Sequence, residues 1–306
     1  KHFPKNELID YLQKAGVRFG SDLNAYTSFS ETVYQLPIPS DDPELLKNGL
    51  QVMRDWAQDA MLQSDEIDKE RGIIMEEMRG SRGAGQRIQD QMLPLLFNGS
   101  LYSERLPIGT EEVVTGFDHQ LIRDFKDRWY RPDLQSIIIV GDIDPQAIEK
   151  EVVRLFSDMK VVKKPVERKD FGIDLLNKNQ FKVITDAEMP QTVARIIIKH
   201  PDTKVRTVAD YRTSLLEGVF NQVINARLRE IAQKPDAPFL QSIISIDDFM
   251  NVFHSMTLAV VPKPEKLEES MKTVVRELKR FEKFGITEGE FQRALSMYSK
   301  GNEMAY

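Results

Sequence analysis

The sequence contains no cysteine. This absence excludes disulfide bonds, thiolate metal sites and a cysteine nucleophile, but it leaves the cellular compartment open. No uninterrupted apolar run approaches the roughly 20 residues that a membrane-spanning helix needs, so we expect no membrane partner. The net charge is -6 and no segment is a long basic run, so the sequence gives no support for nucleic-acid binding.

Histidine is also scarce. The four histidines are His2, His119, His200 and His254, and none of them lies three to five residues from another. Metal-binding helices commonly present two histidines at that spacing, so the chain carries no such histidine pair. It also has no nucleophile-elbow motif and no Walker loop. We expect each histidine to be structural or exposed rather than catalytic.

The length of the chain favours two domains, because 306 residues are many for one core. Residues 160–179, "KVVKKPVERKDFGIDLLNKN", are charged, contain proline and glycine, and show no clear period. They are the best candidate for a linker. We therefore predict a first domain over residues 1–165, a linker over 166–180 and a second domain over 181–306.

Hydrophobic periodicity predicts the secondary structure. The helices are expected at residues 5–15, 41–62, from 64 onward, 145–159, 205–232, 265–284 and from 287 onward. The strands are expected as a pair within 22–39 and at 133–144, 181–185, 192–199, 241–246 and 252–261. Strands that come in runs and are followed by helix pairs favour antiparallel sheets with helices on one face.

One internal similarity supports two related domains. Residues 136–156, "SIIIVGDIDPQAIEKEVVRLF", and 257–278, "TLAVVPKPEKLEESMKTVVREL", each contain an apolar strand pattern, a turn with proline, and a helix with a Val-Val pair. The predicted fold class is therefore α+β, with two similar domains that each contain a mainly antiparallel sheet with helices packed on one face.

An unusual group of carboxylates lies in residues 68–80, "DKERGIIMEEMRG". At about 100° per residue, Glu77 points within about 20° of Glu70, and Ile73 and Ile74 lie between them. Glu76 points about 100° away from Glu77. We expect Glu70 and Glu77 to share an apolar stripe, where a carboxylate is costly unless it is paired or bound to a metal.

Two other interpretations of this region stay open at this point. The helix could be an ordinary surface helix whose carboxylates reach Lys69, Arg71 or Arg79. Residues 80–87, "GSRGAGQR", have glycines like those of a phosphate-binding loop, and a nucleotide-binding domain would predict detectable nucleotide binding. No strand precedes these glycines, so we expect a flexible or capping segment and no nucleotide binding.

Several segments together resemble the pitrilysin/insulinase family of zinc peptidases, the inverzincins with an H-x-x-E-H motif. They occur in the order of that family and cover essentially the whole chain, with the closest likeness to large bacterial members of periplasmic type. The segments are "KHFPKNELIDYLQKAG" (1–16), "GSDLNAYTSFSETVYQLPIP" (20–39), "DKERGIIMEE" (68–77), "RPDLQSIIIVGDID" (131–144) and "EGVFNQVINARLREIA" (217–232).

The resemblance implies roles for particular residues. Glu77 would be the metal-binding carboxylate, and Glu70 would act in catalysis as a supporting carboxylate that holds the geometry of the zinc site. Glu76 would face outward. An extended peptide substrate would add as a strand to an edge formed by Asn24, Ala25, Tyr26 and Thr27. Zinc in such a peptidase lowers the pKa of a bound water to about 7 and polarises the scissile carbonyl.

The H-x-x-E-H motif is not in the sequence, and by the order of the family it would lie just before Lys1. We therefore expect the zinc site to be incomplete and this fragment to be inactive, while the parent is a zinc metalloendopeptidase. Residues 1–165 would form the catalytic-type domain, truncated at its start, and residues 181–306 a non-catalytic domain.

Family members enclose peptides in a chamber of four such domains, so a second half-chain or a homologous subunit would complete it. By analogy the compartment would be periplasmic or otherwise extracytoplasmic. The alternative is a non-catalytic homologue that serves as a structural or peptide-binding partner subunit.

Overall fold

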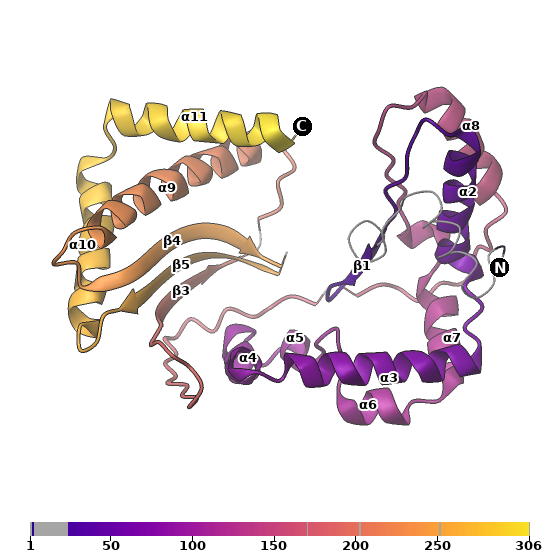
Figure 1. The fold of residues 1–306 in the computed structure, drawn as a ribbon, viewed down its shortest axis with the longest axis horizontal. Helices are drawn as coiled ribbons and strands as arrows, with labels where there is room; N and C mark the ends of the chain where they lie inside the picture. The colour runs from indigo at the N-terminus through magenta and orange to yellow at the C-terminus, as the bar shows by residue number, and fades with distance from the viewer. Residues whose placement is uncertain (1, 3–23, 170, 202, 251, 306) are drawn as a thin grey trace. The chain divides into compact units, whose positions relative to one another are not determined.

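The computed structural model describes residue 2 and residues 24–169, 171–201, 203–250 and 252–305. The helix expected at residues 5–15 lies outside the described residues. Internal contacts divide the chain into two compact units (Figure 1). The first unit comprises residues 1–83 and 101–170, and the second comprises residues 84–100 and 171–306.

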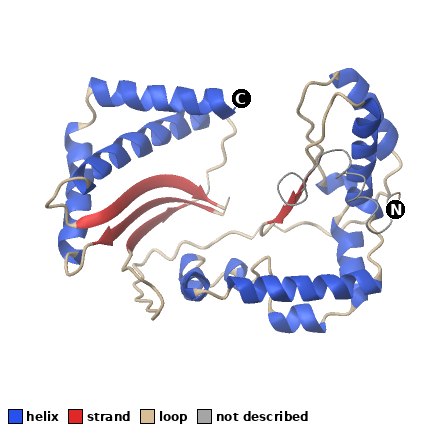
Figure 2. Cartoon of the chain, in the orientation of Figure 1, coloured by secondary structure: helices blue, strands red, loops and turns tan. Residues whose placement is uncertain are grey.

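The first unit is mainly helical and contains one two-stranded antiparallel hairpin (Figure 2). Its elements, in chain order, are β1 (Asn24–Thr27), β2 (Thr32–Gln35), α2 (Pro43–Arg54), the π-helical turn η1 (Asp55–Asp59), α3 (Ser64–Ser81), α5 (Leu101–Glu104), α6 (Glu111–Gly116), α7 (His119–Trp129), the 3-10 turn η2 (Pro132–Leu134) and α8 (Pro145–Phe156).

Helix starts in this unit follow from local chemistry. The Asp42 side chain accepts hydrogen bonds from the backbone N–H groups of Glu44 and Leu45, and proline opens helix α2. Asp144 caps α8 in the same way, again followed by a proline. An aspartate before the helix accepts hydrogen bonds from the free backbone N–H groups of its first turn. Proline suits the first helical position because the N–H that it lacks would have no partner inside the helix.

The second unit is a three-stranded antiparallel sheet with helices. Its strands lie in the order β3-β5-β4, so β5 is central. Leu258 of β5 is opposite Ile196 of β3 on one side and Ile244 of β4 on the other. The elements of this unit are α4 (Ala84–Leu96), β3 (Ala194–His200), α9 (Val208–Ala232), β4 (Phe239–Phe249), β5 (Phe253–Pro262), α10 (Leu267–Phe284) and α11 (Glu288–Ala305).

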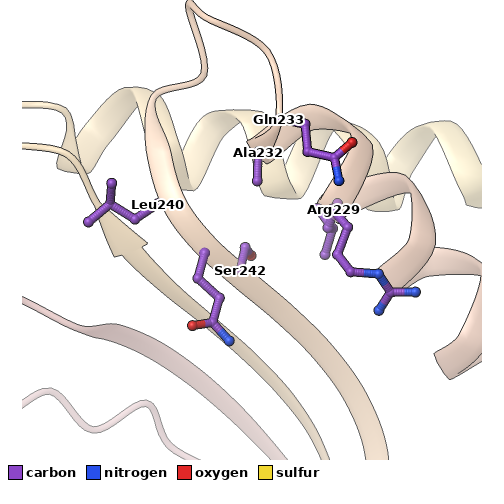
Figure 3. Close-up of a pocket in the computed structure, with 7 residues that line it drawn as sticks. Arg229, Ala232, Gln233, Leu240 and Ser242 are labelled. Atoms are coloured by element: carbon purple, nitrogen blue, oxygen red, sulfur yellow. The ribbon is translucent and has the colours of Figure 1, made fainter.

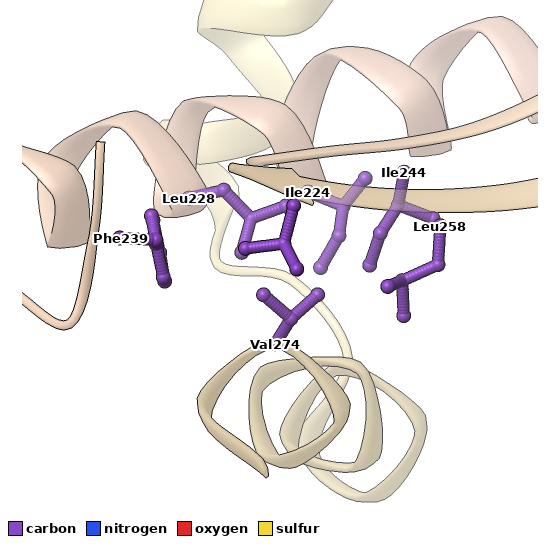
Figure 4. Close-up of a cluster of buried hydrophobic side chains, with 7 residues drawn as sticks. Ile224, Leu228, Phe239, Ile244, Leu258 and Val274 are labelled. Carbon is purple, nitrogen blue, oxygen red and sulfur yellow. The ribbon is translucent and has the colours of Figure 1, made fainter. Parts of the chain in front are cut away.

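The core of the second unit lies between its sheet and two helices (Figure 4). Helices α9 and α10 contribute apolar side chains that meet those of β4 and β5 on one face. The seven buried members are Ile224, Leu228, Phe239, Ile244, Leu258, Val260 and Val274. This arrangement confirms the predicted α+β class, with an antiparallel sheet and helices on one face.

Residues 84–100 pack with the second unit, although the boundaries predicted from the sequence place them before the linker. The Phe97 ring lies 5.9 Å from that of Phe249. Lys199 of β3 donates to the Leu95 carbonyl at 3.2 Å and to Asn98 Oδ1 at 2.8 Å. The helix expected from residue 64 onward ends at Ser81, and α4 begins as a separate helix at Ala84.

Two predicted strands are absent from the described structure. Residues 135–140 and 181–185 form no strand, and the side chains of Ile138, Val140 and Phe181 are 84%, 91% and 90% exposed. A strand is stable only where a neighbour bonds its backbone, and no described strand pairs with either segment. Both helices of the internal similarity form, as α8 and α10. The strand forms only in the second of the two similar segments, residues 257–278, where it is part of β5.

Arg227 joins three helices of the second unit. From α9, its guanidinium makes a bidentate pair with Glu290 of α11, at 2.6 Å from Nε and 2.9 Å from Nη2. It also donates to Glu277 of α10 at 3.3 Å and to the Gly285 carbonyl at 2.9 Å. Arg227 and Glu277 are both buried. This group fixes α10 and α11 against α9.

Acid should weaken the attachment of α11. Hydrogen bonds from Arg227, and further ones from Thr287, lower the pKa of Glu290 from its ordinary value of 4.5 to about 2. Because the folded pKa lies below the unfolded one, the carboxylate contributes stability that is fully present above pH 4.5 and is lost as the pH falls towards 2. The protection factors of the α11 amides, which compare the measured exchange rate with the intrinsic rate at the same pH, should fall across this window, and Glu290→Gln should remove that pH dependence.

Candidate functional site

Helix α3 is anchored along one side. Ile67, Met75 and Met78 are buried, and the two methionines pack with Val114 of α6. Arg71, on the same stripe, donates from Nη1 to the Val114 carbonyl and from Nη2 to that of Phe117, both at 2.5 Å. Its guanidinium also lies 3.7 Å from the centre of the Phe117 ring. The orientation of α3 about its own axis is therefore fixed.

The carboxylates Glu70 and Glu77 are exposed, and Ile73 between them is 58% exposed. The expectation that they share the buried apolar stripe is therefore wrong. The physical reason is that Met75 and Met78, rather than Ile73, provide the apolar surface that α6 covers. Glu70, Ile73 and Glu77 instead form one exposed strip of α3, which we call the open strip.

The surface-helix interpretation predicts salt bridges to Lys69, Arg71 or Arg79, which Glu70 and Glu77 do not make within the described residues. Salt bridges do form on α3, but they use other acids: Glu76 pairs with Arg79 at 2.5 Å, and Glu66 with Lys69 at 2.7 Å. Within the described residues, Glu70 and Glu77 have no hydrogen bond or ion pair. Glu70 and Glu77 are thus left without a described partner, as is Asp65 at the start of the helix, whereas Glu66, Asp68 and Glu76 each have one.

Arg71, one of the basic residues that the sequence offered as a partner for Glu70, pairs with Asp68 instead. Asp68 accepts from Arg71 Nε at 3.1 Å and from His119 Nε2 at 2.7 Å. The hydrogen bond from His119, with that from Arg71, holds the pKa of the Asp68 carboxyl below its usual range. His119 is therefore a structural partner of α3, as expected from the sequence.

The described residues do not form a metal site by themselves. No group of three or more histidine, cysteine or acidic side chains lies close enough to hold a metal ion in the part of the chain that the structure describes. A catalytic zinc ion normally has three protein ligands. Glu77 would supply one, so the donor set is insufficient and no reaction step through zinc follows from these residues alone.

The predicted peptide edge is strand β1. Asn24, Ala25, Tyr26 and Thr27 form this strand, and all four are exposed. The register pairs Asn24 with Gln35, and among the described strands β1 is hydrogen-bonded to β2 only. The other edge of β1 thus has no described strand beside it. No described hydrogen bond or ion pair joins β1 to Glu70 or Glu77.

The direction of the β1 backbone can be derived from the turn. The N–H of Ser28 donates to the Glu31 carbonyl at 2.9 Å, which makes these two residues a hydrogen-bonded pair. Because such pairs alternate in an antiparallel ladder, Tyr26 bonds to β2, whereas Ala25 and Thr27 direct their N–H and C=O groups to the outer edge.

The hairpin is held by an aromatic group that the sequence did not single out. Tyr34 of β2 shares a hydrogen bond of 2.8 Å with the Tyr130 hydroxyl and stacks on Trp56, with ring centres 5.6 Å apart. Burial, with the Tyr130 contact, raises the pKa of Tyr34 well above its usual range. Arg71 was also missed, although its spacing from Ile67 and Met75 places it on the buried stripe of α3.

His2 and His254 have structural partners, whereas His200 is exposed at the end of β3. His2 Nδ1 lies 2.7 Å from Asp55 Oδ1. His254 lies 2.8 Å from Asp248 and 3.2 Å from Glu217; although burial opposes its charge, these two acids raise its pKa. The glycine-rich segment 80–87 spans the end of α3 and the start of α4, with no strand before it, so it lacks the context of a phosphate-binding loop.

Comparison with known families supports the motif-based resemblance. Residues 1–96 match the family model described as insulinase (peptidase family M16), and residues 116–298 match that of the peptidase M16 inactive domain. The second match alone covers more than half of the 306 residues. The chain belongs to peptidase family M16. The predicted resemblance to the pitrilysin/insulinase family is thereby confirmed.

Similar proteins include named zinc proteases. The M16 chain is 30% identical over 246 residues to "Zinc protease PQQL-like" of Arabidopsis thaliana, which covers 80% of the chain and 26% of that protein. It is 31% identical over 233 residues to "Probable zinc protease PqqL" of Haemophilus influenzae, covering 75% of the chain and 25% of that protein.

A solved structure shares the fold. The crystal structure of the periplasmic protease PqqL from Escherichia coli superposes with a TM-score of 0.86 at 25% sequence identity, over 100% of the M16 chain and 34% of that chain. The M16 chain thus spans about a quarter of the length of the two curated relatives above.

Proposed function

We propose that the whole protein is a zinc metalloendopeptidase of the M16 family that cleaves extended or unfolded peptides. The observation that carries this proposal is the open strip, on which Glu70 and Glu77 have no described partner while the opposite side of α3 is anchored. The names of the similar zinc proteases support the same activity.

In this proposal the two glutamates have different tasks. Glu77 would be one ligand of the zinc ion, and ligands from outside this chain would complete the set. Glu70, one heptad earlier on the same strip, would orient the ligands through a hydrogen bond. Zinc, when bound, would polarise the scissile carbonyl. This chain alone is expected to be inactive.

Strand β1 would bind the substrate. A peptide that adds to its outer edge would exchange hydrogen bonds with the backbone of Ala25 and Thr27, with Asn24 and Tyr26 contributing side-chain contacts. Backbone recognition accepts varied side chains, so the substrate class is defined by extended conformation rather than by sequence.

The domain roles follow the same proposal. Residues 1–165 would form the catalytic-type domain and residues 181–306 the non-catalytic one, with a second half-chain or a homologous subunit completing a peptide chamber. A periplasmic location is proposed because the similar Escherichia coli protein is described as periplasmic. None of the described helices is long and apolar enough to cross a membrane.

A second candidate function is a non-catalytic partner subunit. The match of residues 116–298 to the inactive-domain model favours a supporting role for that part of the chain. This candidate predicts that the full-length protein neither holds zinc through Glu77 nor cleaves peptides.

Zinc analysis of the full-length protein separates the two candidates. The unmodified protein is expected to hold about one zinc ion per chain, and Glu77→Gln should reduce that content strongly because it removes a charged ligand. Glu76→Gln is the matched control, since Glu76 is on the same helix and paired with Arg79. Equal zinc content in Glu77→Gln and Glu76→Gln would refute the assignment.

Glu70→Gln should have an intermediate effect. Partners that orient a metal ligand typically contribute 10- to 100-fold in metal affinity, so we expect zinc to bind about 10- to 100-fold more weakly in this variant. The measurement is a competition titration with a chelator, monitored beside Glu77→Gln. An affinity equal to that of the unmodified protein would remove Glu70 from the site.

A further inference from the structure

The outer edge of β4 carries backbone N–H and C=O groups that no other strand of its sheet bonds. Strand β4 is terminal in the order β3-β5-β4, so alternate residues direct N–H and C=O groups away from the sheet. Such a row of backbone groups is a template on which another extended chain can pair. What covers this edge therefore decides whether the second unit can bind a peptide there.

Two asparagines of α9 cover it. Asn225 accepts from the Ile244 N–H at 3.0 Å and donates to the Ile244 carbonyl at 2.7 Å. Asn221 accepts from the Ile246 N–H at 2.9 Å and donates to the Ile246 carbonyl at 3.0 Å. Each side-chain amide thus makes both bonds that a residue of a neighbouring strand would make. We call the pair the asparagine clasp.

The geometry of the clasp follows from the two periodicities. Residues four apart on a helix are separated by about 6 Å along its axis, and residues two apart on a strand by about 6.7 Å. Asn221 and Asn225, one helical turn apart, therefore align with Ile246 and Ile244, two residues apart on β4. The helix and the strand run in opposite directions, so the lower-numbered asparagine bonds the higher-numbered isoleucine. Asn225 also donates to the Asn221 carbonyl at 2.7 Å, which further fixes its side chain.

The clasp ends after these two residues. One turn further along α9 stands the exposed Arg229, at the level of Ser242, whose hydroxyl donates to the Ala259 carbonyl of β5 at 3.0 Å. A guanidinium has no acceptor and cannot repeat the two-bond pattern. A hollow of about 230 Å³ opens here (Figure 3). It is lined by Leu228, Arg229, Ala232, Gln233, Leu240, Gln241 and Ser242.

Strand β1 has no comparable cover among the described residues. Among the described residues, the Ala25 N–H donates to the neighbouring Asn24 Oδ1, at 2.9 Å and at the surface. An incoming strand can displace such a local bond, whereas it would have to break four bonds to replace the clasp. The two edges therefore differ in their availability to an extended chain.

We propose that the asparagine clasp closes the β4 edge to strand addition at Ile244 and Ile246, whereas the β1 edge stays open to an extended peptide. Asn221 and Asn225 are specificity-determining residues in this assignment, although neither contacts substrate. The part that concerns β1 rests on the proposed peptidase function, while the closure of β4 does not.

Photo-crosslinking on the full-length protein tests the proposal. The probe is a ten-residue peptide of alternating threonine and valine with a central benzophenone, used with a chelator present to prevent cleavage. Crosslinked residues are mapped by mass spectrometry in the unmodified protein, in the double variant Asn221→Ala/Asn225→Ala, and in the control Gln222→Ala on the same helix. Crosslinks within β4 are expected to rise at least tenfold in the double variant only.

Hydrogen exchange provides the readout of folding. In the double variant the N–H groups of Ile244 and Ile246 should exchange at least tenfold faster, while the amides that pair β4 with β5 stay protected. Crosslinks within β4 of the unmodified protein would overturn the proposal. So would their absence in a double variant with this exchange pattern.

A milder variant covers the case in which the double variant unfolds. Asn225→Asp keeps an acceptor for the Ile244 N–H but loses the donor to the Ile244 carbonyl, so β4 crosslinks should rise at Ile244 without general loss of structure. No rise would count against the clasp. Crosslinks to residues 24–27 are read separately, and their absence from all variants would contradict the proposed peptide site at β1 without bearing on β4.

Discussion

Replacing Arg227 with alanine is expected to lower the local stability of the second unit by about 3–5 kcal/mol. The guanidinium is the shared partner of Glu277, Glu290 and the Gly285 carbonyl. Without it, Glu277 is left as a buried carboxylate whose remaining ionic partner, Arg280, lies at the surface 3.4 Å away. The loss should exceed that of a typical surface ion pair by several-fold.

The measurement is native-state hydrogen exchange of α9, α10 and α11, because a chain with two units does not unfold in one step. Arg280→Ala is the matched control, since Arg280 also pairs with Glu277 but is exposed, and it should cost less than about 1 kcal/mol. Equal effects of the two substitutions would show that burial of Arg227 contributes little.

Phe239→Ala should destabilise the same unit by about 3–5 kcal/mol. Phe239 is fully buried in the core with Ile224, Leu228 and Val274, at the start of β4 and beside an irregularity in its register. Removing the ring leaves a cavity beneath α9 and α10, which cannot collapse fully because the sheet fixes their distance.

The neighbouring residue supplies the control. Leu240 is 52% exposed, so Leu240→Ala removes little buried surface and should change stability by less than about 1 kcal/mol. Hydrogen exchange of the β4–β5 ladder compares the two variants. A larger effect of Leu240→Ala would mean that the register of β4 in solution differs from that described.

Much of the helical structure could be predicted because its signals are local. Asp42 and Asp144 before prolines mark the starts of α2 and α8, and the hydrophobic period of 205–232 gives α9 to within a few residues at its start. The hairpin of β1 and β2 and the strands β3, β4 and β5 were also expected. Their β-branched and aromatic residues alternate over short runs.

The wrong strand predictions have a non-local cause. Residues 135–140 are as apolar as β5, yet only β5 has described neighbours on both sides. Apolar composition therefore indicates the capacity to form a strand, but pairing decides the outcome. The same reasoning applies to residues 84–100, since a helical period does not reveal with which unit a helix packs.

The candidate site was predictable in composition but not in orientation. The spacing places Glu70 and Glu77 on one side of α3, but the buried side depends on Val114 of α6 and on the Arg71 contacts, 43 and 46 residues along the chain. The asparagine clasp was likewise invisible, because an asparagine in a helix gives no sign of the strand that it will bond.

The anchoring of α3 has a consequence for the order in which the proposed metal centre would be assembled. The described contacts that set the rotation of the helix come from Val114, Phe117 and His119 of the same unit, so the carboxylates of the open strip acquire their direction from residues within that unit. The ligands that complete the proposed centre would bind to a helix whose orientation is already fixed. The conformational entropy of ordering α3 is therefore lost during folding and does not oppose metal binding. If the proposed zinc site exists, loosening Arg71 should weaken zinc binding, although the buried side of α3 that Arg71 anchors does not contact the metal.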